Sequence, residues 1–123
     1  MKSPELLVKK GDIQVDHFPW GRLEWFARQT LSGAKITLGF CHIKPGMNNP
    51  LHFHPNCDEV LHVLEGSILH QLGDESIPMN PGDSLLIPKD VAHNARNVGE
   101  TEAVMSIAFD SGDRQTTHVE EAK

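Results

Sequence analysis

The stretch "HFHPNCDE" at residues 52–59 contains side chains that commonly bind metal ions, two imidazoles and a carboxylate. Side chains at positions i and i+2 of a β-strand point to the same face, roughly 6.6 Å apart. His52 and His54 could therefore reach one ion from a single strand, at nitrogen–metal distances of about 2.1 Å. Because the chain has 8 histidines among its 123 residues, such a pair also arises by chance, and the surrounding sequence must decide.

Glu59 and His93 are the candidates for the remaining ligands. Glu59 lies five positions after His54, the wrong parity for one uninterrupted strand, but the intervening Pro-Asn pair is typical of a turn. A new strand can therefore begin with Glu59 facing inward. His93 follows the apolar run 83–88 and begins another extended segment that could face the same interior, although a histidine in this position would, taken alone, more often be an exposed loop imidazole.

The segments that must position these side chains have the alternating pattern of short β-strands. Each is bounded by a turn signal such as "NPGD" or "PKD", and none has convincing helical spacing. The predicted strands cover residues 22–30, 35–43, 59–65, 67–72, 83–88 and 103–109. Short strands at this spacing predict an all-β sandwich or barrel. Residues 1–10 could form a frayed turn, and the polar tail 111–123 is expected to be loose or laid over the surface.

Length and composition limit the class of protein. The 123 residues fit one domain, and the net charge of −6 argues against a nucleic-acid or anionic-membrane surface. The sequence begins without an apolar leader, and no apolar run approaches the ~18 residues of a membrane helix, so a cytoplasmic location is expected. Cys41 and Cys57 are interpreted as two unrelated reduced thiols, with a disulfide or a nucleophile as the alternatives.

Two spaced sets of residues frame the candidate ligands. The first reads Gly46, five residues, His52-x-His54, four residues, Glu59, six residues and Gly66. The second reads Gly82, five residues, Pro88-x-Asp90, two residues, His93, three residues and Asn97. Nine of these ten fixed positions resemble the two sequence motifs of the cupin superfamily. The exception is Asp90, where the family usually has glycine, but aspartate tolerates the left-handed backbone better than most residues.

The resemblance implies a fold, a metal and a ligand set. It implies a small single-domain cupin, residues 1–123, whose double-stranded β-helix (a jelly-roll barrel) covers about residues 20–110. One divalent transition metal would be held by His52, His54, Glu59 and His93. Three imidazoles and one carboxylate suit Fe, Mn, Ni, Co or Zn better than Mg or Ca. Four protein ligands leave two positions of an octahedral ion for a small molecule.

Several functions remain open at this point. The leading hypothesis is a metal-dependent enzyme that acts on a small polar, oxygen-rich molecule by dioxygenase, isomerase or lyase chemistry. The alternatives are a non-catalytic cupin that binds a metal or small ligand as a sensor or storage module, and a site that is vestigial or only structural. Fold alone does not choose between them.

Residues outside the four ligands have weaker signals. His42 shares strand parity with Ile36, Leu38 and Phe40, so it could point into the barrel as a proton shuttle, or it could be a satisfied structural histidine. Asn48 and Asn49 enter the first motif in a loop that could reach the barrel mouth and contact substrate.

The remaining expectations concern one histidine, one asparagine and the assembly. His70 could face either way, and Asn97 is expected to brace a turn rather than touch a ligand. The strand face of Val60, His62 and Leu64, opposite to Glu59, predicts a homodimer that covers this apolar surface.

Overall fold

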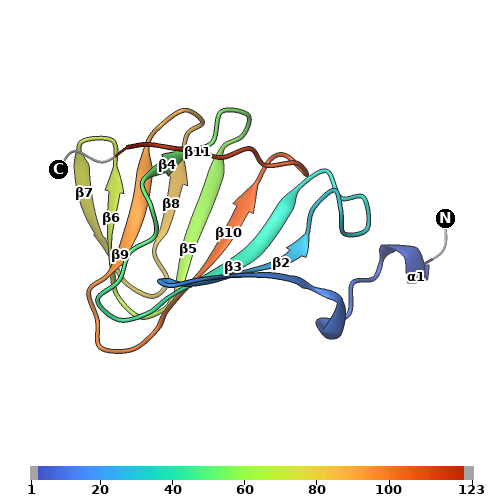
Figure 1. Cartoon of the computed structure of the whole chain (residues 1–123), viewed down its shortest axis with the longest axis horizontal. Coiled ribbons are helices and arrows are strands. Elements are labelled where there is room, and N and C mark those ends of the chain that lie inside the picture. Colours follow the sequence, from blue (N-terminus) through green and yellow to red (C-terminus); the bar gives the residue numbers. More distant parts are fainter. Residues whose placement is uncertain (1–2, 121–123) are drawn as a thin grey trace.

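The computed structural model describes residues 3–120, which form an almost entirely antiparallel β-structure (Figure 1). The helical elements are α1 (Ser3–Leu6) and the 3-10 turn η1 (Lys10–Asp12). The strands are β1 (Gln14–Phe18), β2 (Gly21–Ala27), β3 (Thr37–Ile43), β4 (His52–Phe53), β5 (Glu59–Glu65), β6 (Ile68–Leu72), β7 (Glu75–Met79), β8 (Ser84–Ile87), β9 (His93–Asn97), β10 (Ala103–Phe109) and β11 (Thr117–His118).

The strands form two sheets that enclose one core. The six-stranded sheet has the order β1-β2-β3-β10-β5-β8, and the five-stranded sheet has the order β11-β4-β9-β6-β7. The core between them contains Trp25, Ile43, Val63, Ile68 and Met105, each at most 1% exposed. This arrangement confirms the predicted all-β jelly-roll barrel. The six-stranded sheet extends further than the expected range of 20–110, because β1 pairs with β2 in register.

Strand β5 shows how the chain turns Glu59 inward. The residues between His54 and Glu59 form a bend rather than a strand, and β5 begins at Glu59 itself. Along β5, Glu59, Leu61 and Val63 are buried, whereas Val60 and Leu64 are exposed. The turn thus resets the parity of the strand, as the Pro-Asn pair predicts.

Of the two possibilities for His42, the structure shows the satisfied structural histidine and not a side chain that points into the barrel. On β3 the alternate residues Cys41 and Ile43 belong to the core, so His42 lies on the outer face of the six-stranded sheet. There its Nε2 pairs with Glu24 and its Nδ1 lies 3.0 Å from a carboxylate oxygen of Glu102. The buried His42 ring is therefore held between two carboxylates, away from the barrel interior.

The orientation of β3 follows from the packing of Trp25 on the neighbouring strand. A Cβ atom at Gly39 would lie 2.6 Å from the indole ring of Trp25 and 2.2 Å from the carbonyl oxygen of Glu24. Only glycine fits against the indole, so the face of β3 that carries Gly39 lies toward the core, and Leu38 on the opposite face points outward. Leu38 is accordingly 37% exposed.

The tail crosses the barrel instead of leaving it. In Figure 1 the red C-terminal segment runs along the upper edge of the molecule to β11, which pairs with β4. The Val119 amide also donates to the Leu51 carbonyl at 3.0 Å. Residues 111–120 are therefore laid over the barrel, the second of the two predicted possibilities, while residues 121–123 of the predicted tail lie outside the described residues. At the other end of the chain, α1 lies apart from the strands.

No membrane-crossing helix occurs in the part of the chain that the structure describes, since its only α-helix has four residues.

Asn97 braces the turn after β9, as expected. Its side chain is fully buried, and its Nδ2 donates to the carbonyl oxygens of Ile43 and Thr101, both at 2.8 Å. Its Oδ1 accepts a hydrogen bond from the Gly99 amide at 2.9 Å. One amide side chain thereby ties β9 to the end of β3 and closes the following turn.

We expect Asn97→Ala to lower the free energy of unfolding by about 2–3 kcal/mol, because buried groups left without a partner cost about 1–3 kcal/mol each. Denaturant unfolding measures this loss. Asn80→Ala, which removes an exposed asparagine from another turn, is the matched control and should change little. Equal stability of Asn97→Ala and the unsubstituted protein would contradict the bracing role.

Candidate metal centre

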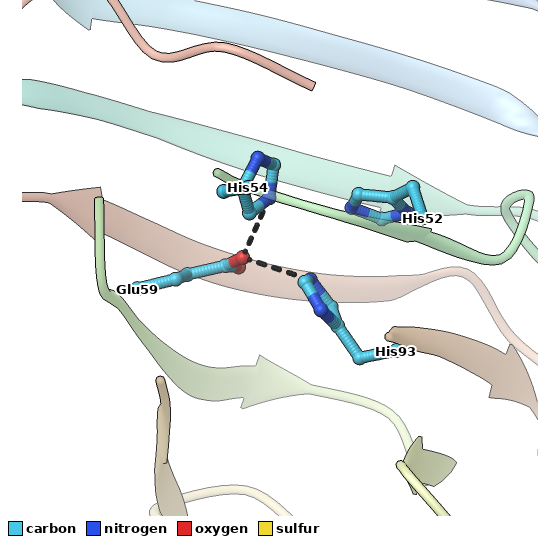
Figure 2. Close-up of side chains that lie close together, drawn as sticks. All are labelled: His52, His54, Glu59 and His93. Atoms are coloured by element: carbon cyan, nitrogen blue, oxygen red, sulfur yellow. Dashed lines mark hydrogen bonds and ion pairs between the residues drawn. The ribbon is translucent and has the colours of Figure 1, made fainter. Parts of the chain in front are cut away.

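Four side chains from three strands and one loop meet inside the barrel (Figure 2). His52 lies on β4, His54 directly follows β4, Glu59 begins β5 and His93 begins β9. His52 and His93 are direct partners across the β4–β9 pair. One potential ligand atom from each residue lies within 4.8 Å of all the others. The two halves of the sequence pattern, 39 residues apart between His54 and His93, therefore supply one compact group.

Backbone carbonyls fix the three imidazole rings. Nδ1 lies 2.7 Å from the Pro50 carbonyl oxygen in His52, 2.9 Å from that of Gln115 in His54, and 2.9 Å from that of Val91 in His93. Because a carbonyl oxygen can only accept, each Nδ1 must carry the proton. Each neutral ring therefore has an unprotonated Nε2, which is the tautomer and orientation that metal-binding histidines require.

The Nε2 atoms meet an oxygen that also has only lone pairs. Glu59 Oε1 lies 3.1 Å from His93 Nε2 and 3.3 Å from His54 Nε2 (dashed lines in Figure 2). His54 Nε2 is buried and has no hydrogen-bond partner within residues 3–120. Lone pairs facing one another in a buried space repel unless a cation or a proton lies between them. The donor set therefore fits a divalent ion, and its nitrogen and oxygen atoms suit the borderline transition metals.

Burial and neighbouring groups shift the pKa values of Glu59 and His52. Without a metal, a proton between Nε2 and the carboxylate takes the place of the cation. Desolvation raises the pKa of Glu59, but hydrogen bonds and positive charge from His54 and His93 in that form outweigh it, and the pKa is lowered. Desolvation, reinforced by His93, lowers the pKa of His52 to about 3. Glu59 is therefore ionised and His52 neutral at neutral pH.

A cavity of about 280 Å³ adjoins the four residues. Its wall is mostly apolar, with side chains from the β1–β2 hairpin, β5 and β10: Phe18, Trp20, Leu23, Leu61, Met105 and Phe109. Phe18 and Trp20 stack with ring centroids 4.8 Å apart. A ligand beside the metal group would therefore contact aromatic and aliphatic side chains.

Sequence reasoning missed the importance of two polar residues in this cavity. His70 on β6 is fully buried, stacks on His93 with 5.8 Å between ring centroids, and has neither ring nitrogen paired within residues 3–120. Alternation alone could not decide which way His70 faces. Arg114 belongs to the tail and lies over the rings of Trp25 and Phe109, at 4.7 and 5.2 Å. No periodic signal in the tail indicates this position.

The loop asparagines take different positions. Asn49 borders the cavity, and its Oδ1 accepts the Ala95 amide at 2.8 Å. Asn48 is exposed, does not border the cavity, and its Nδ2 donates to the Asn49 carbonyl oxygen at 3.1 Å.

Asp90 adopts the left-handed backbone with φ of 69°, as the motif requires, and its amide donates to the His54 carbonyl oxygen at 3.0 Å.

An antiparallel jelly roll with three imidazoles and one carboxylate gathered inside it defines the class of small metal-site β-barrels. Residues 39–110, more than half of the chain, match the family described as Cupin domain. The chain is also 39% identical over 98 residues to Protein SchB from Streptomyces halstedii, which covers 79% of this chain and 71% of that protein. The chain belongs to the cupin family.

Other relatives share the fold over part of their length. The chain is 32% identical over 96 residues to oxalate oxidase GF-2.8 from Triticum aestivum, covering 72% of this chain and 42% of that protein. The structure of an oxalate decarboxylase from Lactobacillus farciminis superposes with a TM-score of 0.82 at 18% identity, covering 89% of this chain and 34% of that one. The chain thus spans less than half of each of these two proteins, and the decarboxylase shows the fold alone.

The metal-free protein should lose stability as the pH falls below about 6.5. Desolvation and the neighbouring His93 lower the pKa of His70 from 6.5 to about 4. Between these values the unfolded chain binds a proton that the folded protein does not, so stability rises with pH there, by up to about 1.4 kcal/mol per pH unit for each such histidine.

We expect His70→Phe to reduce this pH dependence, measured as the unfolding free energy between about pH 4 and about pH 7. His17→Phe, which removes an exposed histidine, is the matched control and should retain the slope of the unsubstituted protein. The same slope in His70→Phe would show that His70 is not buried in neutral form.

Proposed function

We propose that the protein is a metal-dependent cupin enzyme that acts on a small oxygen-bearing molecule. One observation carries the proposal. The unprotonated Nε2 atoms of His54 and His93 face the Glu59 carboxylate in a buried space, beside a cavity large enough for a ligand. His52, His54, Glu59 and His93 are the proposed ligands of one divalent transition metal, with Fe, Mn, Ni, Co and Zn as the candidates. The similarity to an oxalate oxidase supports an enzyme rather than a storage module.

The residues of the chain have distinct proposed roles. A bound metal would supply Lewis acidity, or redox chemistry if it is iron or manganese. The neutral histidines set the position of the ion, and Glu59 contributes the single ligand charge. Asn49 is the proposed polar ligand contact, because its Oδ1 is occupied by the Ala95 amide and its Nδ2 donor remains for a molecule in the cavity. Asn48 and His42 lie outside this cavity and have no proposed contact.

The apolar wall contributes by excluding water around the reacting group. Low dielectric strengthens every charge interaction with the ligand and protects the site from competing reactions with solvent. The two positions that four protein ligands leave on an octahedral ion point to a molecule that offers one or two oxygen atoms.

The first test of the proposal is metal content. Protein purified without added metal should contain about one transition metal per chain by elemental analysis, and His54→Ala and His93→Ala should each retain well under one. Glu59→Gln should keep the fold and bind the metal more weakly, because it removes the only ligand charge. His62→Ala is the matched control, since His62 lies on the outer face of β5, the strand that begins with Glu59, and its Nδ1 forms a hydrogen bond with the Ser84 hydroxyl.

Full metal content in both histidine variants would remove the proposed site.

The second test is oxygen uptake and product formation by the metal-loaded protein with small carboxylic and hydroxy acids. A protein that binds metal and ligand but converts none of them would favour the non-catalytic binding module.

We also propose a homodimer that uses the outer face of the six-stranded sheet. Four residues form an apolar row across neighbouring strands β3, β10, β5 and β8: Leu38, Ala108, Val60 and Leu86. Leu38, Val60 and Leu86 are 37%, 46% and 60% exposed. A continuous apolar row on the open face of a sheet is commonly covered by a partner, and a two-fold pairing would bring it against its own copy.

Val60→Lys should convert such a dimer into a monomer, because the partner's row would face a buried, unpaired charge. Light scattering at micromolar concentration measures the change, with the unsubstituted protein at twice the chain mass. Glu75→Lys, a substitution of an exposed residue on β7 of the other sheet, is the matched control. A strict monomer before substitution would rule out the dimer.

A further inference from the structure

The tail holds Arg114 in a defined position at the cavity. Asn56, in the bend between His54 and Glu59, donates from Nδ2 to the Asp113 carbonyl oxygen at 2.9 Å and accepts from the Gln115 amide at 2.9 Å. The residues on both sides of Arg114 are therefore fixed to the bend by one asparagine side chain. The Arg114 side chain borders the cavity and lies against the ring of Trp25.

Arg114 lacks the partner that an arginine in this position requires. Its Nε is shielded from solvent and has no hydrogen-bond partner, and no carboxylate of residues 3–120 lies within ion-pair distance of the guanidinium. Desolvation lowers its pKa, which reflects the cost of holding this charge away from water. Guanidinium groups that are partly shielded from water are normally paired with carboxylates or phosphates, to which their planar donors are matched.

The charges around the cavity would favour an anion when the proposed metal is bound. The charged side chains in its wall are Arg114, Glu59 and Asp16, and Asp16 accepts a hydrogen bond from Trp25 Nε1 at 3.1 Å. With a divalent ion in place, the formal charge of these groups together would be +1. A ligand with one negative charge would neutralise the cavity.

The wall also indicates the rest of the ligand. A small dianion without an apolar part would leave the stacked Phe18 and Trp20 and the aliphatic side chains facing water in a cavity of about 280 Å³. An aromatic or aliphatic body would cover them. His70 offers a further hydrogen bond in the same cavity, since both of its ring nitrogens are unpaired within the described residues.

We propose that Arg114 binds the anionic oxygens of a small monoanion with an aromatic or aliphatic body, which lies in the cavity beside the metal ligands. This inference rests on the proposed function in taking that cavity as the ligand site. It adds the chemical class of the ligand and assigns its recognition to a residue of the tail, outside both sequence motifs.

Benzoate and its neutral analogue benzamide are the probes for this proposal. The chain has two tryptophans and no tyrosine. Trp20 borders the cavity and Trp25 contacts Arg114, so tryptophan fluorescence reports on both sides of the proposed site. Titrations use the full chain, metal-free and zinc-loaded, so that the readout does not depend on catalysis.

Arg114→Gln should weaken benzoate binding by about tenfold to a hundredfold, the usual effect of losing a charged hydrogen bond. Benzamide binding should change less than about twofold. The benzoate affinity of Arg114→Lys should lie between those of the unsubstituted protein and Arg114→Gln, because lysine keeps the positive charge but lacks the planar pair of donors. Arg28→Gln is the matched control, because Arg28 lies 5.4 Å from the centroid of the same Trp25 ring but does not border this cavity. It should bind benzoate as the unsubstituted protein does.

Four results would overturn the proposal: no saturable benzoate binding by the unsubstituted protein, unchanged binding in Arg114→Gln, equal losses for benzoate and benzamide, and an equal loss in Arg28→Gln. The last would place the anion in the smaller cavity of about 110 Å³ that both arginines border. Metal content and thermal melting of each variant separate a folding defect from a binding defect, and Arg114→Lys carries the test if Arg114→Gln does not fold.

The outcomes also separate this inference from the proposed function. Arg114-dependent benzoate binding by a protein that takes up no metal would leave the inference standing and remove the proposed function. Metal binding without Arg114-dependent benzoate binding would remove this inference and leave the proposed function standing.

Discussion

The hydrogen bonds from three imidazole Nδ1 atoms to backbone carbonyls are the constraint on which the site depends. They come from Pro50 before β4, Val91 before β9 and Gln115 in the tail, so three separate connections must be in place before the rings point at Glu59. These bonds choose the tautomer as well as the direction of each ring. The barrel therefore serves the site by holding loops at fixed distances, and ligand residues alone would not suffice.

The period of the β-strand separates the functions of neighbouring residues. On β5 the inward positions supply Glu59 and core packing, while the outward positions supply the apolar row that contains Val60. One strand can thus contribute to an interior site and an outer contact surface with little interference, because adjacent side chains never share a face. The same rule explains why the His42 ring, one residue from the core residue Cys41, belongs to a separate cluster of carboxylates.

Sequence reasoning located most of the barrel and grouped the four candidate ligands, because motif spacing and strand alternation are local signals. It failed where tertiary packing decides. The direction of β3 depends on Trp25 packing against Gly39, a contact between strands. Strand β7 contains a proline and little alternation, and β11 has two residues, so neither has a recognisable pattern. Arg114 is placed by hydrogen bonds of Asn56 with the neighbouring tail residues, 57 and 59 positions away in sequence, which no local pattern encodes.

The bond between His54 Nδ1 and the Gln115 carbonyl makes the tail and the metal site two coupled equilibria. A metal that selects the His54 ring in one tautomer favours the docked tail, and a docked tail favours that tautomer. By thermodynamic reciprocity, each event must strengthen the other by the same free energy. Because the docked tail also carries Arg114, occupancy of the proposed metal site would be transmitted to the far wall of the cavity without any movement of the barrel. The affinity of a ligand bound at Arg114 would then differ between the metal-free and the metal-loaded protein.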